Sequence, residues 1–477
     1  MEIISQPFAL FCVSALVVYH LLPRRGQNIW LAVFSFFFAW SWRWDFAVIL
    51  AISVSANFFL GKIIAGSTNH KKKWLVTGVA VNTAWLIFYR LAVIGHLDLL
   101  ARVLQKGASL TTEILLPIGF SFYTLQAIAY LVDVYQKQIN AEDDLIDFAV
   151  YLGYFPRLLS GPIERAKSFL PQLKQDRMVD NNFLAEGAWL ILIGLFRKLV
   201  LSGLFFTLIP EGIFTRPMEF ATSDRWVSLL VYSFWLYNDF AGYTSLVRGI
   251  SLLFGIRLSP NFRQPMFART FLEFWNRWHM SLSFWLRDYI FFPIQRALGR
   301  RGYSSSSPAR VLAPPIITML VSGFWHNATF SLAAWGMLHG IYQIWDHLTS
   351  RKPEHIIPSR QPFWRQIIMA LRVYLLLLPT WILFATGGLK LSGYFGLSLF
   401  HGGGMLRGQP LELVIPLMGL CASVILDWLQ EMNGEGTPVK SLPHLAQSAF
   451  AALLVFCVLL SILWSSIPSA SFIYQGF

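Results

Sequence analysis

The sequence predicts an all-α protein that crosses a membrane many times. Of its 477 residues, 55% are hydrophobic and only 13% are charged, and the mean hydropathy is positive. Ordinary soluble domains do not have this composition. Because apolar segments able to cross or nearly cross ~30 Å of hydrocarbon recur along the chain, we expect about 11–12 transmembrane or re-entrant helices. They are expected to form a single membrane-embedded domain, residues 1–477.

The apolar segments give the positions of these helices. In chain order they are residues 8–22, 29–42, 46–60, 74–94, 114–134, 183–209, 226–246, 311–325, 329–345, 373–385, 413–429 and 450–464. Residues 141–174 and 261–310 mix aromatic with charged side chains, which is typical of interfacial or re-entrant helices. The sequence contains no internal repeat of the transporter kind and no soluble domain.

Basic residues orient the helices. The formal net charge of +13 would suit a nucleic-acid partner, but the Lys and Arg residues cluster in short loops between apolar segments. Such clusters mark the cytoplasmic side of a membrane protein. Arg24 and Arg25 follow the first span, and Lys71, Lys72 and Lys73 follow the third. We therefore expect an outside N-terminus, a lipid bilayer as partner and no nucleic acid.

The three cysteines indicate neither a metal site nor a disulfide framework. Cys12, Cys421 and Cys457 all lie inside apolar segments and lack the paired spacing of zinc ligands. We expect no bound metal.

His326 interrupts the apolar segments near residue 325. The segment 311–325 would reach only ~22 Å as a helix, which is too short to cross comfortably. Basic residues flank both this segment and the next one, so the pair predicts a hairpin whose turn, at His326 and Asn327, lies deep in the membrane. A neutral imidazole there would serve as a base near neutral pH, or as a core histidine bonded to a carbonyl. On a continuous helix His339 would point ~220° away, which predicts a packing role.

A second histidine, His279, lies where Trp, Arg and His alternate at near-helical spacing. Glu273 and Arg277 are spaced as an ion pair on one helix, and His279 and Ser283 would share a face. The alternative is an interfacial amphipathic helix whose tryptophans form an aromatic belt.

Further ionisable residues lie inside apolar segments. Asp239, beside Asn238, requires a buried partner or a water-filled cavity. Arg197 and Lys198 are expected to extend from a helix end to the membrane surface, in a structural role.

Several motifs occur in a fixed order. They are LPIGFSFY at 116–123, GPIER at 161–165, YNDFAGY at 237–243, NFRQP at 261–265, FWNRWHMSLS at 274–283, WLRDY at 285–289 and GFWH at 323–326. This succession resembles the membrane-bound O-acyltransferases, and within them the bacterial branch that O-acetylates alginate or peptidoglycan or transfers D-alanine. The resemblance covers nearly the whole chain and implies helices around a central tunnel.

The resemblance implies roles for particular residues. It makes His326 the catalytic histidine and places His279 beside the acyl tunnel. The other predicted tunnel residues are Asn238, Asp239, Trp325 and Asn327. Asn327 stands where this branch usually has glycine, which leaves the identity of the acyl group open.

The function implied is transfer of an acyl group, acetyl from acetyl-CoA, across the bacterial inner membrane to an extracytoplasmic polysaccharide or peptidoglycan. No tightly bound cofactor is expected, and an extracytoplasmic SGNH-type acetyltransferase would be the partner. Arg296, Arg300 and Arg301 would attract the phosphates of CoA, or would only set the topology. The alternative function is a transporter or flippase of an acylated lipid or glycan.

The final residues, FIYQGF at 472–477, have the form F-x-Y-x-x-F. The resemblance implies that the hydroxyl of Tyr474 carries the acyl group before a partner enzyme receives it. The alternative is an aromatic anchor at the membrane surface. An outside N-terminus and an even number of crossings place this segment outside.

Overall fold

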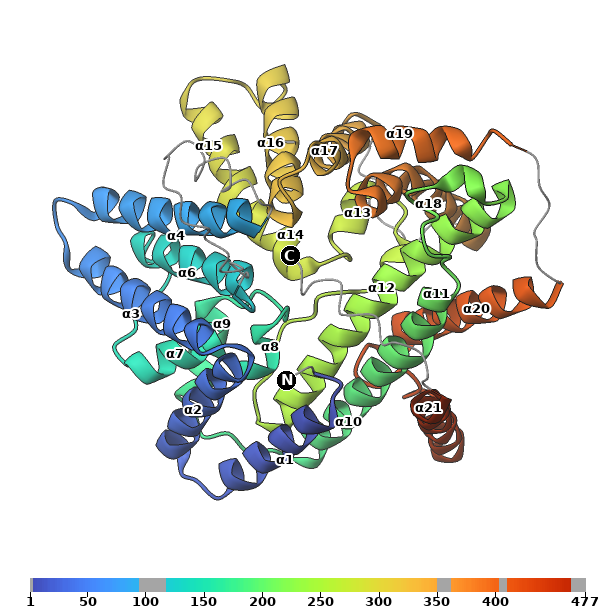
Figure 1. Ribbon diagram of the computed structural model, residues 1–477. Coiled ribbons are helices and arrows are strands. Elements are labelled where there is room, and N and C mark those ends of the chain that lie inside the picture. Colours follow the sequence, from blue (N-terminus) through green and yellow to red (C-terminus); the bar gives the residue numbers. More distant parts are fainter. Residues whose placement is uncertain (1–2, 94–116, 350–361, 403–409, 465–477) are drawn as a thin grey trace, which may run out of the picture. The chain divides into compact units, whose positions relative to one another are not determined.

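The computed structural model describes residues 3–93, 117–349, 362–402 and 410–464 (Figure 1). These residues contain helices and no strand, which confirms the predicted all-α fold. Every predicted span overlaps a helix. In the described part of the chain, five helices are long and apolar enough to cross a membrane: Trp44–Gly66, Asn181–Thr207, Phe363–Thr386, Val414–Asn433 and His444–Leu463. The chain is a multi-pass membrane protein.

The described residues divide into two compact units. The first is built from segments within Met1–Ala188 and Val247–Ser259, and the second from segments within Trp189–Leu246 and Pro260–Ile473. The helices of the first unit are α1 (Gln6–His20), α2 (Arg24–Trp42), α3 (Trp44–Gly66), α4 (Lys71–Val93), α6 (Phe120–Tyr135), α7 (Leu145–Gly153), α8 (Phe155–Leu158) and α9 (Ala166–Leu173). Helix α3 lies against α2, α4, α6 and α7 (Figure 1).

Two helices, α10 (Asn181–Leu195) and α12 (Thr222–Leu253), contribute residues to both units. The other elements belong to the second unit. They are η1 (Phe196–Leu201), α11 (Ser202–Thr207), η2 (Pro217–Glu219), η3 (Pro265–Phe267), α13 (Phe271–Trp275), α14 (Met280–Leu286), η4 (Arg287–Phe291), α15 (Phe292–Arg300), α16 (Pro308–His326), α17 (Phe330–Thr349), α18 (Phe363–Thr386), α19 (Leu389–Ser398), α20 (Pro410–Asn433) and α21 (His444–Trp464). The predicted interfacial stretch 261–310 is therefore a series of short helices.

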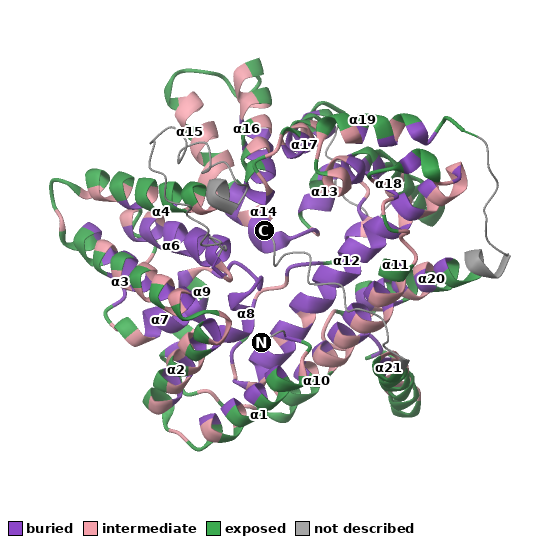
Figure 2. Ribbon diagram, viewed as in Figure 1, coloured by how far each residue is buried: buried purple, intermediate pink, exposed green. Residues whose placement is uncertain are grey.

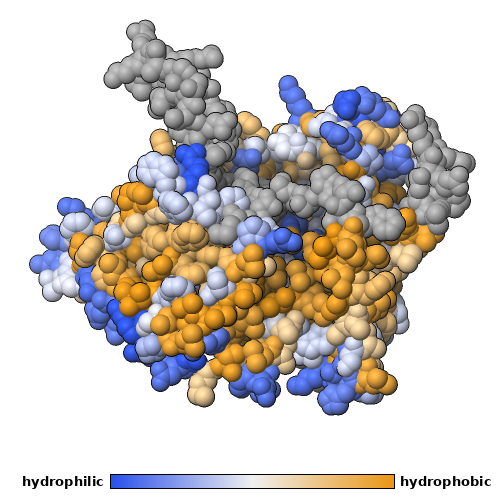
Figure 3. Space-filling model, turned by 60° about the horizontal axis from the view of Figure 1, so that its bottom comes forward, coloured by the Kyte–Doolittle hydropathy of each residue, from blue (hydrophilic) through white to orange (hydrophobic). Residues whose placement is uncertain are grey.

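Many apolar side chains face outward. Helix α21 is largely exposed (Figure 2), and Leu463 and Leu445 leave more than four fifths of their surface uncovered. Figure 3 shows hydrophobic side chains gathered over a broad part of the surface, with hydrophilic ones nearer its edges. Large exposed apolar patches of this kind mark a membrane-contact surface.

Buried ion pairs correct one prediction. Arg197 and Lys198 do not extend to the membrane surface; both are buried in the π-helical segment η1. The guanidinium of Arg197 pairs with Asp427 of α20, and the ammonium of Lys198 pairs with Asp239 of α12. Asp239 thus has the buried partner that its position required. The sequence could not show this, because each pair joins residues far apart in the chain.

The Arg197 cluster includes further hydrogen bonds. Arg197 donates to the Asn238 Oδ1 atom and to the Gln430 Oε1 atom, each over 2.8 Å. The hydroxyl of Tyr237 donates to the Asp427 carboxylate, also over 2.8 Å. A buried charge satisfied in this way becomes strongly destabilising when its partner is removed.

We predict that Asp427→Asn lowers the melting temperature of the detergent-purified protein, because it leaves the Arg197 charge buried without a counter-ion; such a loss costs about 3–5 kcal/mol. The control is Glu219→Gln, which breaks an exposed pair with Arg216 and should leave the melting temperature unchanged. Equal melting temperatures for the two variants would show that the buried pair contributes nothing to stability.

Candidate active site

The hairpin of α16 and α17 is the core of the candidate site. The two helices lie side by side and are joined by a turn at residues 327–329. A Cβ atom added to Gly336 of α17 would lie 2.2 Å from the carbonyl oxygen of Met319 of α16. Only glycine permits so close an approach of the two backbones. The predicted hairpin therefore forms. Helix α16 begins at Pro308, however, and its 19 residues span about 28 Å, which is longer than the ~22 Å expected for residues 311–325.

His326 is the last residue of α16 and is only 4% exposed. Its ring centroid lies 4.9 Å from that of Trp325, 5.5 Å from that of Trp335 on α17, and 5.3 Å from that of Phe384 on α18. Rings from three helices thus enclose the imidazole. They exclude bulk water from it and fix its position by packing.

His279 lies in a turn and not on a helix, which overturns the expectation that it shares a helical face with Ser283. Helix α14 begins only at Met280, and His279 has the left-handed backbone conformation, with φ 40°. For a residue other than glycine this conformation carries strain of about 1–3 kcal/mol and persists only where the surroundings enforce it. The predicted ion pair between Glu273 and Arg277 is present, at 3.0 Å.

The side chain of Asn261 holds this turn. Its Oδ1 atom accepts hydrogen bonds from the backbone N–H and the hydroxyl of Ser281, at 3.2 and 2.9 Å. The same atom lies 3.1 Å from Nδ1 of His279. Because a backbone N–H can only donate, this atom is the amide oxygen, and His279 must donate to it through Nδ1. When the imidazole is neutral, Nε2 therefore carries the lone pair.

Trp325 joins the two histidines. Its ring centroid lies 6.1 Å from the ring of His279 and 4.9 Å from the ring of His326. Residues 47 positions apart in the sequence are thus brought to one aromatic side chain within the second unit. Asn327 follows directly as the C-cap residue of α16 and is half-buried.

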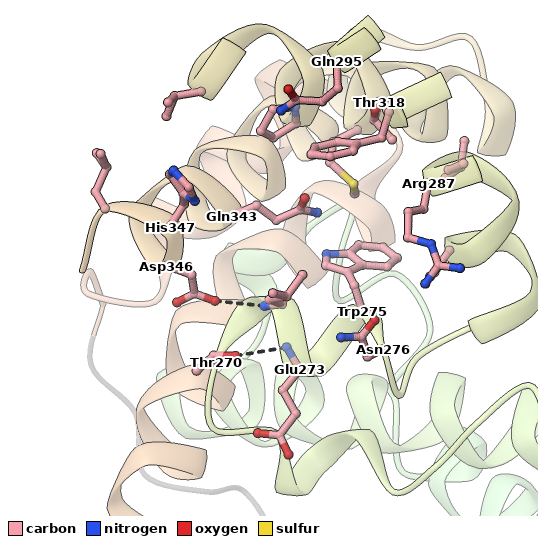
Figure 4. A pocket seen from close by; sticks show the side chains of 18 of the residues that line it. Thr270, Glu273, Trp275, Asn276, Arg287, Gln295, Thr318, Gln343, Asp346 and His347 are labelled. Atoms are coloured by element: carbon pink, nitrogen blue, oxygen red, sulfur yellow. Dashed lines mark hydrogen bonds between the residues drawn. The ribbon is translucent and has the colours of Figure 1, made fainter. Parts of the chain in front are cut away.

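A cavity of about 1120 Å³ lies beside this region, within the second unit (Figure 4). Trp275 and Thr318 line it, together with apolar residues of α14, η4 and α16. Arg269, Arg287 and Arg310 also line it. The cavity therefore combines an apolar wall with three guanidinium groups and the carboxyl groups of Glu273 and Asp346. Because Arg269 is paired with Glu273, a ligand with an apolar part and an anionic part would meet Arg287 and Arg310.

Helix α17 fixes the wall of the cavity. The carboxylate of Asp346 accepts a hydrogen bond from the backbone N–H of Leu272 over 2.9 Å, and the hydroxyl of Thr270 accepts one from Glu273 over 3.0 Å (Figure 4). Both bonds cap the N-terminus of α13. Because α13 is only five residues long, these caps determine where Trp275, its last residue, lies.

An ion-pair network includes two residues that line the cavity, Arg269 and Glu273. Glu273 accepts hydrogen bonds from Arg269 and Arg277, and Arg277 also pairs with Glu431 of α20 at 2.9 Å. Burial alone would raise the pKa of Glu273, but the hydrogen bonds from Arg269 hold that pKa below its ordinary value. Glu273 is thus kept as a carboxylate, which makes a role as a proton donor unsuitable for it.

Some predicted residues lie away from the cavity. Arg296, Arg300 and Arg301 are exposed residues at the end of α15 and are not among those that line it. Asn238 and Asp239 are held in the buried clusters of Arg197 and Lys198. Tyr474 lies outside the described residues. The roles predicted for these residues stay predictions.

Sequence reasoning missed Asn261, Trp335 and the cavity arginines. Asn261 opens the NFRQP motif, so its place in a motif was a usable indication. The sequence contained no such indication for Trp335, because an aromatic residue in an apolar helix is common. The predicted direction of His339 assumed one continuous helix, and this assumption was wrong because the chain reverses after His326. The ring of Trp335 contacts the rings of both His326 and His339, at 5.5 and 4.6 Å.

Comparisons with known proteins find relatives that match most of the chain. The probable alginate O-acetylase AlgI of Azotobacter vinelandii is 32% identical over 401 residues, which are 83% of this chain and 77% of that protein. A peptidoglycan O-acetyltransferase of Helicobacter pylori is 30% identical, over 70% of this chain and 68% of that protein. A teichoic acid D-alanyltransferase of Streptococcus thermophilus is 31% identical, over 58% of this chain and 67% of that protein.

The family assignment follows from these similarities and from one further match. Residues 77–380, well over half of the chain, match the family described as membrane-bound O-acyltransferase. This range contains both histidines, the turn that holds His279 and the whole cavity lining. The chain belongs to the membrane-bound O-acyltransferase family and is an O-acyltransferase.

Proposed function

We propose that this enzyme takes an acetyl group from acetyl-CoA at the cytoplasmic face of the bacterial inner membrane and delivers it to a hydroxyl acceptor that serves an extracytoplasmic polysaccharide or peptidoglycan. The observation that carries the proposal is the placement of His279 and His326 on one aromatic residue, Trp325, in the same unit as the cavity. The names of the relatives, which refer to alginate and peptidoglycan, support an extracytoplasmic polymer as acceptor.

The reaction requires a base. As the oxygen of the acceptor attacks the thioester carbonyl, its O–H bond breaks and the proton passes to the imidazole of His326. The C–S bond then breaks, and the thiolate of CoA takes up a proton, so that an ester and a free thiol are formed. General-base assistance of this kind contributes about 10²–10⁴-fold to the rate.

His279 is proposed to act beside the acyl group and not as the base. Its Nδ1 atom is fixed on Asn261, in a strained turn. Strain of this kind is often found where a side chain must be held in one direction. Held in this way, the ring limits the space next to Trp325 and thereby the size of the acyl group.

The cavity suits the donor. A thioester of CoA has an apolar acyl end, an extended amide arm and an anionic nucleotide. Arg287 is half-exposed, lies over the rings of Phe284 and Phe292 and donates from Nε to the Asp288 carboxylate over 2.9 Å. Arg310 is held by Gln295 over 3.1 Å. Guanidinium groups on such supports bind phosphate well because their planar donors are already oriented.

We predict that His326→Ala abolishes acyl transfer while the protein still inserts and purifies normally, because only the base is removed. His279→Ala should lower turnover less, since that ring shapes the site without moving a proton. Turnover of acetyl-CoA in nanodiscs measures both variants. The ranking is wrong if His279→Ala loses as much as His326→Ala, and the assignment of the base fails if glycan O-acetylation in cells with His326→Ala stays near wild type.

The two sets of arginines can be separated by their effect on donor binding. We predict that Arg287→Gln and Arg310→Gln each raise the KM for acetyl-CoA by about 10- to 150-fold with little change in kcat, as loss of a charge-assisted contact worth about 1.5–3 kcal/mol would do. The matched control replaces Arg296, Arg300 and Arg301 together by Gln. If only the triple variant raises the KM, the CoA phosphates bind at the end of α15 and not at the cavity.

Removal of a single hydroxyl group tests the role proposed for the C-terminal motif. Under the proposal, the hydroxyl of Tyr474 carries the acyl group to an SGNH-type partner enzyme outside the membrane. Tyr474→Phe keeps the aromatic ring and removes the nucleophile, so we predict loss of glycan acetylation with normal insertion. Mass spectrometry of the terminal peptide should show an acyl adduct in the unsubstituted protein. Intact acetylation in the variant would leave the motif as an anchor only.

A further inference from the structure

His339 has an environment that packing alone does not explain. It lies on α17, is only 1% exposed, and neither of its ring nitrogens has a hydrogen-bond partner among the described residues. A neutral imidazole always offers one N–H donor and one acceptor. Leaving both unsatisfied in a buried place costs about 1–3 kcal/mol for each group. A histidine that served only to fill space would therefore be a poor choice compared with leucine or phenylalanine.

The two tryptophans beside His339 also carry buried polar groups without hydrogen-bond partners among the described residues. Its ring centroid lies 4.6 Å from that of Trp335 and 5.1 Å from that of Trp275. The indole N–H groups of both tryptophans are buried and have no partner in the described part of the chain, and the same holds for the hydroxyl of Thr318. Buried polar groups are normally satisfied by protein, ligand or ordered water. The unpartnered polar atoms of His339, Trp335 and Trp275 therefore point to bound water or to a polar ligand.

The position of this cluster connects two parts of the site. Trp275 and Thr318 line the cavity. Trp335 contacts both His339 and His326, at centroid distances of 4.6 and 5.5 Å. His339 is thus linked through Trp275 to the cavity, where the donor is proposed to bind, and through Trp335 to the proposed base. Several polar groups close together supply the partners that an ordered water requires.

We propose that His339 is a positioning residue for proton transfer: it anchors ordered water that returns the proton from His326 to the leaving thiolate in the cavity. This proposal rests on the proposed function. The acceptor O–H bond breaks and its proton moves to His326; the water at His339 then passes a proton to sulfur as the C–S bond breaks. The thiolate becomes a thiol, His326 is neutral again, and no other reactant is needed.

The experiment compares donors whose leaving groups differ in their need for a proton. Thiol release by the full chain in nanodiscs, with the proposed SGNH-type partner enzyme and a soluble oligosaccharide as final acceptor, is measured with acetyl-CoA and with an acetyl aryl thioester. An aryl thiolate is a stable anion and leaves without protonation. His339→Leu should lower kcat with acetyl-CoA about 10²-fold and leave kcat with the aryl thioester near that of the unsubstituted protein.

Two further variants complete the test. His339→Gln keeps one donor and one acceptor and should restore most of the rate with acetyl-CoA. His401→Phe, which replaces an exposed histidine whose ring contacts the carbonyl oxygen of Leu397 over 2.9 Å, should change neither rate. Equal losses with both donors in His339→Leu, or no rescue by His339→Gln, would show that His339 acts only through packing. If the unsubstituted protein releases no thiol from acetyl-CoA, the proposed function itself fails.

Discussion

The close packing of α16 against α17 is the constraint on which the candidate site depends. Gly336 has no side chain, so its backbone lies directly on the carbonyl oxygen of Met319. At this separation the ring of Trp335 on α17 reaches His326 at the end of α16, and the same ring contacts His339 one turn further along α17. A larger residue at position 336 would push the helices apart. It would thereby remove the aromatic walls that fix His326, without changing any residue of the reaction.

Helix α17 also fixes part of the cavity wall, far from the turn that joins it to α16. Asp346, ten residues beyond Gly336, caps the short helix α13. A five-residue helix cannot hold its own position in water or in a membrane. Its caps and the ion pairs of Glu273 therefore determine where Trp275 lies. The cavity wall and the surroundings of His326 are thus both consequences of the position of α17.

Within the second unit, the charged residues of η1 and those that line the cavity have different surroundings. Arg197 and Lys198 are buried and paired with Asp427 and Asp239, which removes their charges from interaction with a substrate. The guanidinium of Arg287 pairs with Asp288, but this pair is half-exposed beside the cavity, so that solvent and a ligand can reach it. Buried pairs add little net stability when formed but strongly disfavour any arrangement that separates them. This difference explains why charged residues of the same type are assigned a structural role in η1 and a binding role near α14.

The sequence by itself determined the fold class, the positions of the helices and the order of the family motifs, and it gave His279 and His326 as candidate site residues. These features depend on composition, on apolar segment length and on local motifs, all of which can be read along the chain. Only the tertiary structure decided that Trp325 joins the two histidines, that Asn261 holds His279 in a left-handed turn, that Arg197 and Lys198 are ion-paired, and that His339 lies next to the same tryptophan as His326. Each of these depends on contacts between segments far apart in the sequence or on the point where a helix ends. Helical periodicity carries no information about such contacts, because it describes one face of one helix and not the neighbour against which that face packs.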